Sequence, residues 1–200
     1  MAWPLRVVAF AVALAPANTV CASEPEPVER RIEWGVPLVH SFGLLTTMRV
    51  TEAFLWPKPF AQFDTWGDHY KEAFTKPPLF DSTAPFMRWD GDSLAINVVG
   101  HGFFGSELYL RARQCRFGWL GSLAFAAGAS TVWEYGFEGN GVRPSLQDLV
   151  YTPLMGLAFG ELRYAAWSAA GKLKRAGERR VLRAVFDPFG ELERWAGTVC

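Results

Sequence analysis

The chain has 200 residues, and its 20 Lys and Arg balance 20 Asp and Glu, so its formal net charge is zero. A neutral chain has no basic field for gripping phosphate backbones, and we therefore expect no nucleic-acid partner. Half of the residues are hydrophobic, which excludes intrinsic disorder. Aromatic residues reach 15% and charged residues only 20%, and this balance favours a protein near a membrane.

Residues 1–22 predict a secretory signal peptide. Arg6 is their only charged residue, and the apolar run Val7–Ala15 follows it before a small residue at Ala22. This run is far shorter than the ~20 residues that a membrane-spanning helix needs, and it is typical of a cleaved signal. Residues 23–35 then form a charged, Pro-containing segment, which we interpret as a polar tether.

Cleavage would leave two cysteines, Cys115 and Cys200, in the mature chain. In an oxidising compartment they form either a disulfide bridge or a small buried residue and a free terminal thiol, and the sequence leaves both open.

Four long apolar segments predict an all-α helical bundle over residues 36–174. Pro57 ends the first segment because its ring clashes with the preceding helical turn. Residues 57–89 are rich in proline and aromatic residues and predict an irregular connector that packs on the bundle, with a short helix at Asp64–Ala73. The four segments are Val36–Trp56, Asp92–Arg113, Trp119–Phe137 and Ser145–Lys174.

The last long segment carries two further signals. Ser145 and Asp148 predict a capping box, in which the hydroxyl and the carboxylate each accept a free backbone amide. Gly156 and Gly160 form a G-x-x-x-G pair, which allows two helices to approach closely. Residues 175–200 form a basic and aromatic tail that suits either a surface helix at lipid headgroups or a solvated face of the bundle.

The charge distribution argues against a simple four-span membrane protein. After signal cleavage, the basic clusters at residues 111–116 and 172–183 would both lie outside, whereas Lys and Arg tend to stay in the cytoplasm. We therefore expect a membrane-associated bundle in the periplasm or on the periplasmic face of a membrane, with an integral inner-membrane protein as the alternative. The expected partner is a membrane lipid or another envelope component.

Residues 100–105 match the G-x-G-x-x-G pattern of dinucleotide-binding proteins, and residues 94–99 before them could form a strand. That pattern also requires an acidic residue about 20 positions on, at the end of a second strand. Residues 120–132 hold no acid, and we expect no nucleotide to bind.

Polar side chains recur on these otherwise apolar segments. Buried carboxylates are unfavourable unless they are paired, so we expect them to meet inside the bundle around His101 and Glu134. Three kinds of site remain compatible with them: a divalent metal site, a Ser-His-acid set for acyl transfer, or a neutralised network that fixes helix register. His40 and His69 are interpreted as incidental. The polar set is Asp90, Asp92, Asn97, His101, Ser130, Glu134, Asp148 and Glu161.

The spacing of these residues resembles the bacterial family catalogued as domain of unknown function 3943. The likeness covers roughly residues 86–161 and adds Glu138 and Ser145 to the candidate binding residues. A weaker likeness links the chain to VanZ-like membrane proteins. Both resemblances imply an exported or membrane-associated envelope protein, and neither implies a reaction. The motifs are Trp89-Asp90-Gly91-Asp92, Asn97, His101 with Gly105, Tyr109, Ala112-Arg113, Ser130-x-x-Trp133-Glu134-Tyr135, Glu138, Pro144-Ser145-x-x-Asp148, Thr152-Pro153 with Gly156, and Gly160-Glu161.

Two hypotheses of function follow from the sequence. In the first, the polar cluster serves a binding or structural role in the cell envelope. In the second, the protein is an envelope hydrolase or transferase that acts on a lipid or cell-wall precursor. His101 would then be the general base and Ser130 the nucleophile or a substrate ligand, while Glu134 or Asp148 orients the imidazole. The sequence leaves enzymatic activity undecided and identifies no cofactor.

Overall fold

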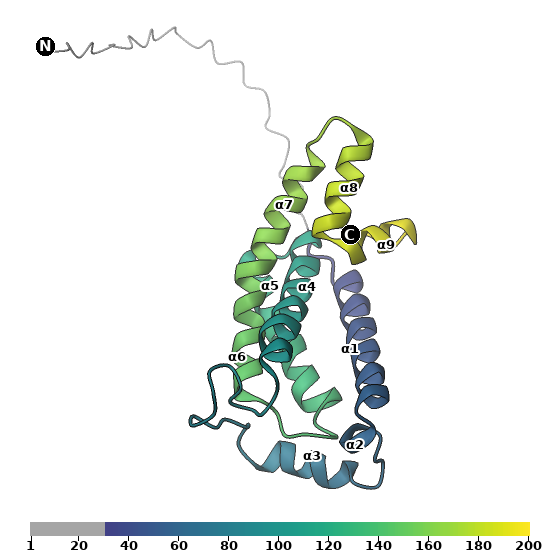
Figure 1. Cartoon of the computed structure of the whole chain (residues 1–200). Coiled ribbons are helices and arrows are strands. Elements are labelled where there is room, and N and C mark those ends of the chain that lie inside the picture. Colours follow the sequence, from purple (N-terminus) through teal and green to yellow (C-terminus); the bar gives the residue numbers. More distant parts are fainter. Residues whose placement is uncertain (1–30) are drawn as a thin grey trace, which may run out of the picture.

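The computed structural model describes residues 31–200, and every long regular element in that range is a helix (Figure 1). The all-α prediction is therefore confirmed. The predicted signal peptide and most of the predicted tether lie outside the described residues. None of the helices within residues 31–200 combines the length and the hydropathy that a membrane crossing requires.

The four predicted long segments are all helical, and three of them contain a π-helical stretch. The predicted connector contains the two short helices α2 and α3, and the tail folds into α8 and α9. The α-helices are α1 (Gly35–Leu55), α2 (Pro57–Phe60), α3 (Trp66–Thr75), α4 (His101–Gln114), α5 (Trp119–Val132), α6 (Leu146–Met155), α7 (Glu161–Gly171), α8 (Ala176–Phe186) and α9 (Pro188–Trp195). The π-helical stretches are η1 (Ala95–Gly100), η2 (Trp133–Phe137) and η3 (Gly156–Gly160).

Helix α4 lies at the centre of the bundle and contacts α1, α5, α6, η3 and α7 (Figure 1). Its residues Leu108 and Tyr109 are fully buried, and with Phe104 and Trp133 they form the main hydrophobic core. Burial of each such side chain contributes roughly 1.5–3 kcal/mol to folding. The core therefore joins α4 to α1, α5 and η2.

Small residues let α4 approach α6 and η3 until their backbones touch. A Cβ atom added to Gly105 would collide with the backbone carbonyl of Thr152, and one added to Gly156 would lie 2.8 Å from the carbonyl oxygen of Gly105. Gly160 packs in the same way against the ring of Tyr109. The close approach predicted from Gly156 and Gly160 is confirmed.

Residues 94–105 are helical throughout, in η1 and the start of α4. The helix predicted over residues 92–113 is therefore confirmed here, and the Gly-rich motif lies inside it and not after the strand that a dinucleotide site requires. The reason is tertiary, because Gly105 is needed for helix packing and not for a phosphate-binding turn.

The connector packs against the bundle, as predicted. Leu79 and Ser145 form an isolated bridge, in which the Leu79 amide donates to the carbonyl of Pro144. Helix α3 lies at the same end of the molecule as α2 and contacts η2 (Figure 1). The predicted connector, residues 57–89, therefore covers this end of the bundle.

The tail forms an integral part of the fold. Cys200 is disulfide-bonded to Cys115, across a separation of 85 residues. Asp187 is fully buried and caps α9 by accepting the amide of Gly190. It also accepts a hydrogen bond from Arg111 of α4, so the tail is attached to the central helix by charge as well as by the disulfide.

His40 belongs to a buried polar network that joins Glu107 and Arg111 of α4 to the tail. Its interpretation as incidental is therefore wrong. Its imidazole faces Glu193 of α9 and lies 3.4 Å from a carboxylate oxygen of Glu107. Arg111 and Arg163 also bind Glu107. The sequence could not indicate this network because its members come from α1, α4, α7 and the tail.

Replacement of Gly105 by Ala tests the contact between α4 and α6. The new methyl group would meet backbone that cannot move aside, so we expect the free energy of unfolding to fall by about 1–3 kcal/mol. Gly128→Ala on α5 is the matched control, because its Cβ meets nothing within 4 Å and Ala favours helix by about 0.5–1 kcal/mol. Chemical denaturation measures both, and equal stability of the two variants would contradict the contact.

Candidate functional site

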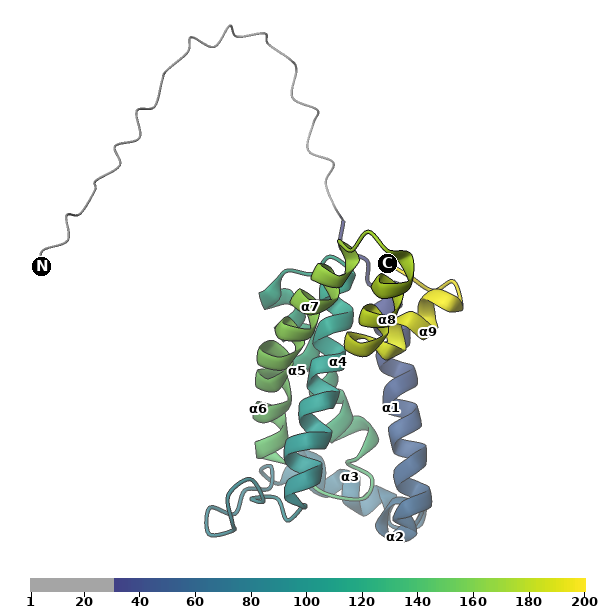
Figure 2. The ribbon, with the colours of Figure 1, turned by 45° about the horizontal axis from the view of Figure 1, so that its top comes forward.

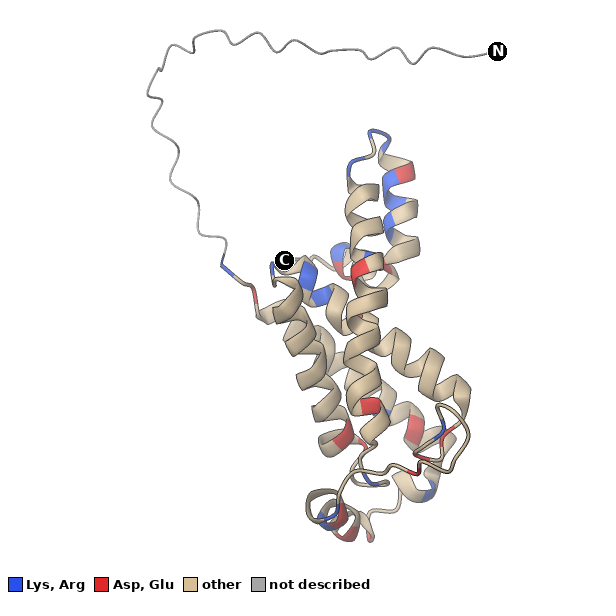
Figure 3. Cartoon of the chain, turned by 90° about the vertical axis from the view of Figure 1, so that its left-hand side faces the viewer, with Lys and Arg blue, Asp and Glu red and all other residues tan. Residues whose placement is uncertain are grey.

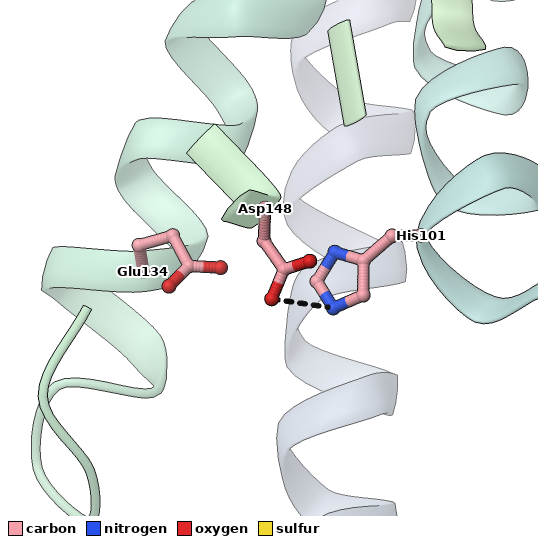
Figure 4. A group of neighbouring side chains, drawn as sticks. All are labelled: His101, Glu134 and Asp148. Atoms are coloured by element: carbon pink, nitrogen blue, oxygen red, sulfur yellow. Dashed lines mark ion pairs between the residues drawn. The ribbon is translucent and has the colours of Figure 1, made fainter. Parts of the chain in front are cut away.

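Three titratable side chains from three helices meet inside the bundle (Figure 4). His101 is the first residue of α4, Glu134 lies in η2, and Asp148 lies in the first turn of α6. They are only 7%, 1% and 2% exposed. Nε2 of His101 is 3.5 Å from Oδ2 of Asp148, and one donor atom from each of the three lies within 4.8 Å of the others. The meeting of these groups, which the sequence predicted, is thus observed.

The start of α6 sets the direction of both carboxylates. The hydroxyl of Ser145 accepts the amide of Asp148 at 3.1 Å, as the predicted capping box requires. The other half of the prediction is wrong, because the Ser145 amide donates to Oε2 of Glu134 at 2.7 Å. Since a neighbouring helix satisfies that amide, the Asp148 carboxylate is free to face His101.

A hydrogen-bonded layer supports this arrangement from one side. Asp90 accepts the hydroxyl of Ser145 at 2.7 Å and the side-chain amide of Asn97 at 2.8 Å. Asn97 is fully buried and also donates to the carbonyl of Met87. These contacts hold Ser145, and through it both the cap of α6 and Glu134. Three of the predicted binding residues therefore support the central group.

Thr152 fixes the other side of the imidazole and was not singled out as a site residue. Its hydroxyl lies 3.0 Å from Nδ1 of His101. With the ring proton assigned to Nδ1, the imidazole donates to Thr152 and leaves the lone pair of Nε2 facing Asp148. Thr152 lies one helical turn beyond Asp148, and this spacing is the signal that could have identified it.

Burial keeps the group in its uncharged form near neutral pH. It raises the pKa of Glu134 to about 8 and, with the nearby Glu134, the pKa of Asp148 to about 9. It lowers the pKa of His101 to about 4. For Asp90, burial opposes ionisation, but hydrogen bonds from Ser145 and Asn97 outweigh it and lower the pKa. Asp90 is therefore the ionised acid of the set.

A cavity of about 900 Å³ opens beside His101, between α1 and α4 and under α8 and α9. Figure 2 shows α1 standing on the far side of α4 from α6 and α7. Aromatic and aliphatic side chains form most of the wall, among them Met48, Phe104 and Trp133.

Three further acids share this cavity wall: Glu52, Asp92 and Glu138. Burial raises the pKa of Glu52 to about 7 and the pKa of Glu138 well above its ordinary value. Burial and the charge of Asp90 raise the pKa of Asp92. The predicted residues Asp92 and Glu138 therefore belong to the cavity, together with Glu52, which the sequence did not single out.

Two predicted residues do not join the central group as expected. The hydroxyl of Ser130 donates to the backbone carbonyl of Asp148 at 3.4 Å and makes no hydrogen bond to His101 among the described contacts. Glu161 accepts hydrogen bonds from Arg113 and from the hydroxyl of Tyr109. The prediction that Glu161 joins the cluster is wrong, because Arg113 of α4 pairs with its carboxylate and neutralises the charge.

Residues 86–189 match the family model described as Domain of unknown function (DUF3943). The match covers just over half of the 200 residues, and the chain belongs to this family. The predicted resemblance is confirmed and extends beyond residue 161. It contains His101, Glu134 and Asp148, whereas α1 lies outside it. No curated protein and no solved structure matched the chain. The likeness to VanZ-like proteins stays a prediction.

The raised carboxylate pKa values predict how stability depends on pH. In buffer with a chelator, the folded chain keeps protons on Glu134 and Asp148 up to about pH 8 and 9, whereas their ordinary pKa values are 4.5 and 3.8. The folded state then binds more protons than the unfolded state, so raising the pH from about 6.5 to 8 lowers stability. Each acid contributes up to about 1.4 kcal/mol per pH unit, and Glu52 and Glu138 act in the same direction.

His101 acts in the opposite sense but only at lower pH, because its pKa falls from 6.5 to about 4 on folding. Urea denaturation at several pH values measures the slope. We expect Glu134→Gln and Asp148→Asn to flatten it. Glu161→Gln should not, because hydrogen bonds and the charge of Arg113 outweigh burial and lower the pKa of Glu161. An unchanged slope in both site variants would show that these acids are already ionised.

Proposed function

We propose that this protein works in the cell envelope, seated against a membrane, and binds an elongated apolar molecule in the cavity beside His101. The cavity carries this proposal. Its volume of about 900 Å³ lies within the roughly 300–1,000 Å³ of small-molecule sites, which are mostly apolar with a few placed polar groups. A lipid acyl chain has the length and the chemistry that such a wall would hold.

The polar side chains of the cavity wall support a ligand that has a polar head group at one end. Glu52, Asp92 and Glu138 lie near the end of the cavity where His101 begins α4, and Phe186 and Phe189 lie toward the other end. Protonated acids donate hydrogen bonds. A lipid ester or hydroxyl would therefore find donors at one end and apolar contact along the rest of its length.

The outer surface supports the seat against a membrane. Val39 and Phe42, one turn apart on α1, are 69% and 66% exposed. Helix α5 contains no charged residue, and in Figure 3 the charged residues gather toward the ends of the bundle, with uncharged helix between them. Large exposed apolar patches mark interaction surfaces. A lipid surface would cover this one.

The disulfide supports the export of the chain. Cys115 and Cys200 are bonded, and such bonds persist in oxidising compartments such as the periplasm. This agrees with the signal peptide expected from residues 1–22.

The hydrolase or transferase hypothesis has narrower support. His101 is neutral and reaches the cavity wall, as a general base requires. Its proposed nucleophile, Ser130, instead donates to the backbone of Asp148. The binding role is therefore the better supported of the two.

A substitution that narrows the cavity tests whether the cavity binds a lipid chain. We expect the purified full chain to bind the fluorescent fatty acid cis-parinaric acid. Met48→Trp, which places a larger side chain in the cavity, should weaken binding about tenfold or more. Val39→Trp is the matched control, because Val39 lies on the same helix but faces outward. Binding that is absent in the parent chain, or equal in a folded Met48→Trp variant, would refute the cavity as a lipid site.

A flotation assay with vesicles of phosphatidylethanolamine and phosphatidylglycerol tests the membrane seat. We expect the parent chain to float with the vesicles and the double variant Val39→Glu, Phe42→Glu to lose most of that binding, because two charges would enter the apolar layer. Lys71→Glu changes the net charge by the same amount on the exposed surface of α3. If Lys71→Glu lost binding equally, charge alone would explain the effect and the apolar seat would be wrong.

A further inference from the structure

The buried group at His101 contains two carboxylate oxygens that accept no hydrogen bond from residues 31–200. Oε1 of Glu134 and Oδ1 of Asp148 are both buried without a hydrogen-bond partner. Each such atom has lost its hydration without a replacement, and the described residues hold others, such as Oε2 of Glu52. Both belong to side chains that are almost completely buried. An additional group at this position would account for them.

The surroundings lack the cations that usually neutralise buried acids. Within residues 31–200, no Lys or Arg forms an ion pair with Glu134 or Asp148. At the other buried network, by contrast, Arg111 and Arg163 both bind Glu107. The His101 group is thus a buried acidic site to which residues 31–200 supply no Lys or Arg partner.

The donor atoms lie at a separation that a metal ion bridges. One atom from each of His101, Glu134 and Asp148 lies within 4.8 Å of the other two. A first-row ion binds nitrogen and oxygen at about 2.0–2.2 Å, so two ligand atoms at a tetrahedral angle around it are about 3.4 Å apart. Movements of up to about 0.8 Å by each side chain close the difference from 4.8 Å. Figure 4 shows the three side chains pointing toward one another.

The hydrogen bonds that Thr152 and Ser145 make to the candidate ligands resemble those that orient the ligands of known metal sites. Nδ1 of His101 contacts the hydroxyl of Thr152, which leaves Nε2 for a ligand. The amide of Ser145 holds Oε2 of Glu134 and leaves Oε1 free. In known metal sites such partners fix the tautomer and the orientation of each ligand.

From these contacts we propose that His101, Glu134 and Asp148 bind one divalent first-row transition-metal ion, such as zinc or manganese. One imidazole and two carboxylates suit these ions, whereas Mg²⁺ and Ca²⁺ prefer oxygen ligands alone. Two carboxylates neutralise the charge of the ion. His101 also lines the cavity, so the metal site would adjoin the apolar chamber. This site goes beyond the proposed lipid binding and does not depend on it.

The metal ion alone is the probe. The full chain is stripped with a chelator and dialysed against Zn²⁺ or Mn²⁺, and bound metal is measured by elemental analysis. We expect one equivalent per chain with micromolar or tighter affinity. His101→Gln, Glu134→Gln and Asp148→Asn should each weaken binding about a hundredfold. His40→Gln and Glu161→Gln are the controls, since they change a buried histidine and a paired glutamate elsewhere, and should bind like the parent.

A second measurement uses the parent chain, so that the proposal can be tested even if the site variants fail to fold. X-ray absorption of the zinc-loaded parent chain should show one imidazole and otherwise oxygen ligands. Thr152→Val keeps the shape of its side chain and should weaken binding about tenfold by releasing the ring. The proposal is overturned if the parent binds neither ion below about 0.1 mM, if folded site variants bind like the parent, or if the spectrum lacks the imidazole. No lipid is present, so this failure leaves the proposed function untouched, and a failure of lipid binding leaves the metal site untouched.

Discussion

The contact between the backbone of α4 and that of α6 and η3 is the constraint on which the site depends. Gly105 lies against the carbonyl of Thr152, and Gly156 lies against Gly105. The two helices run in the same direction (Figure 1), so each step of one turn along α4 matches one turn along α6. His101, one turn before Gly105, is therefore brought to Asp148, one turn before Thr152. A side chain at Gly105 would separate the helices and the site with them.

Two buried polar networks lie in different parts of the bundle, and they are neutralised in different ways. Around Glu107 and Asp187, guanidinium groups from α4 and α7 supply the opposite charge. Around Glu134 and Asp148, hydrogen bonds from Ser145 and Thr152 hold the groups without supplying a charge. Burying an uncompensated carboxylate is strongly unfavourable. The group around Glu134 and Asp148 must therefore hold either protons or a cation, which makes it a place where binding and pH are coupled.

Helix α1 separates two apolar regions, and this explains its composition. Its inner side includes Leu44 and Met48, which line the cavity and pack near the core, while Val39 and Phe42 are exposed. A helix that is apolar on both sides suits a position between a ligand chamber and a lipid surface. The cavity, the outer surface and the His101 group thus involve the same part of the molecule, although each rests on separate contacts.

The sequence by itself determined the helices and the identity of the central residues. Apolar segment length, Pro57 and the Ser145 cap are local signals, and they placed the long helices correctly because helix formation depends on neighbours within a turn or two. His101, Glu134 and Asp148 were recognisable as rare polar residues in apolar surroundings. Only the tertiary structure decided which groups meet. Arg113 takes Glu161 out of the cluster, Glu134 takes the Ser145 amide, and Asp187 of the tail reaches Arg111. These pairings join residues many positions apart, and side-chain charge and reach select among partners only after the helices have packed.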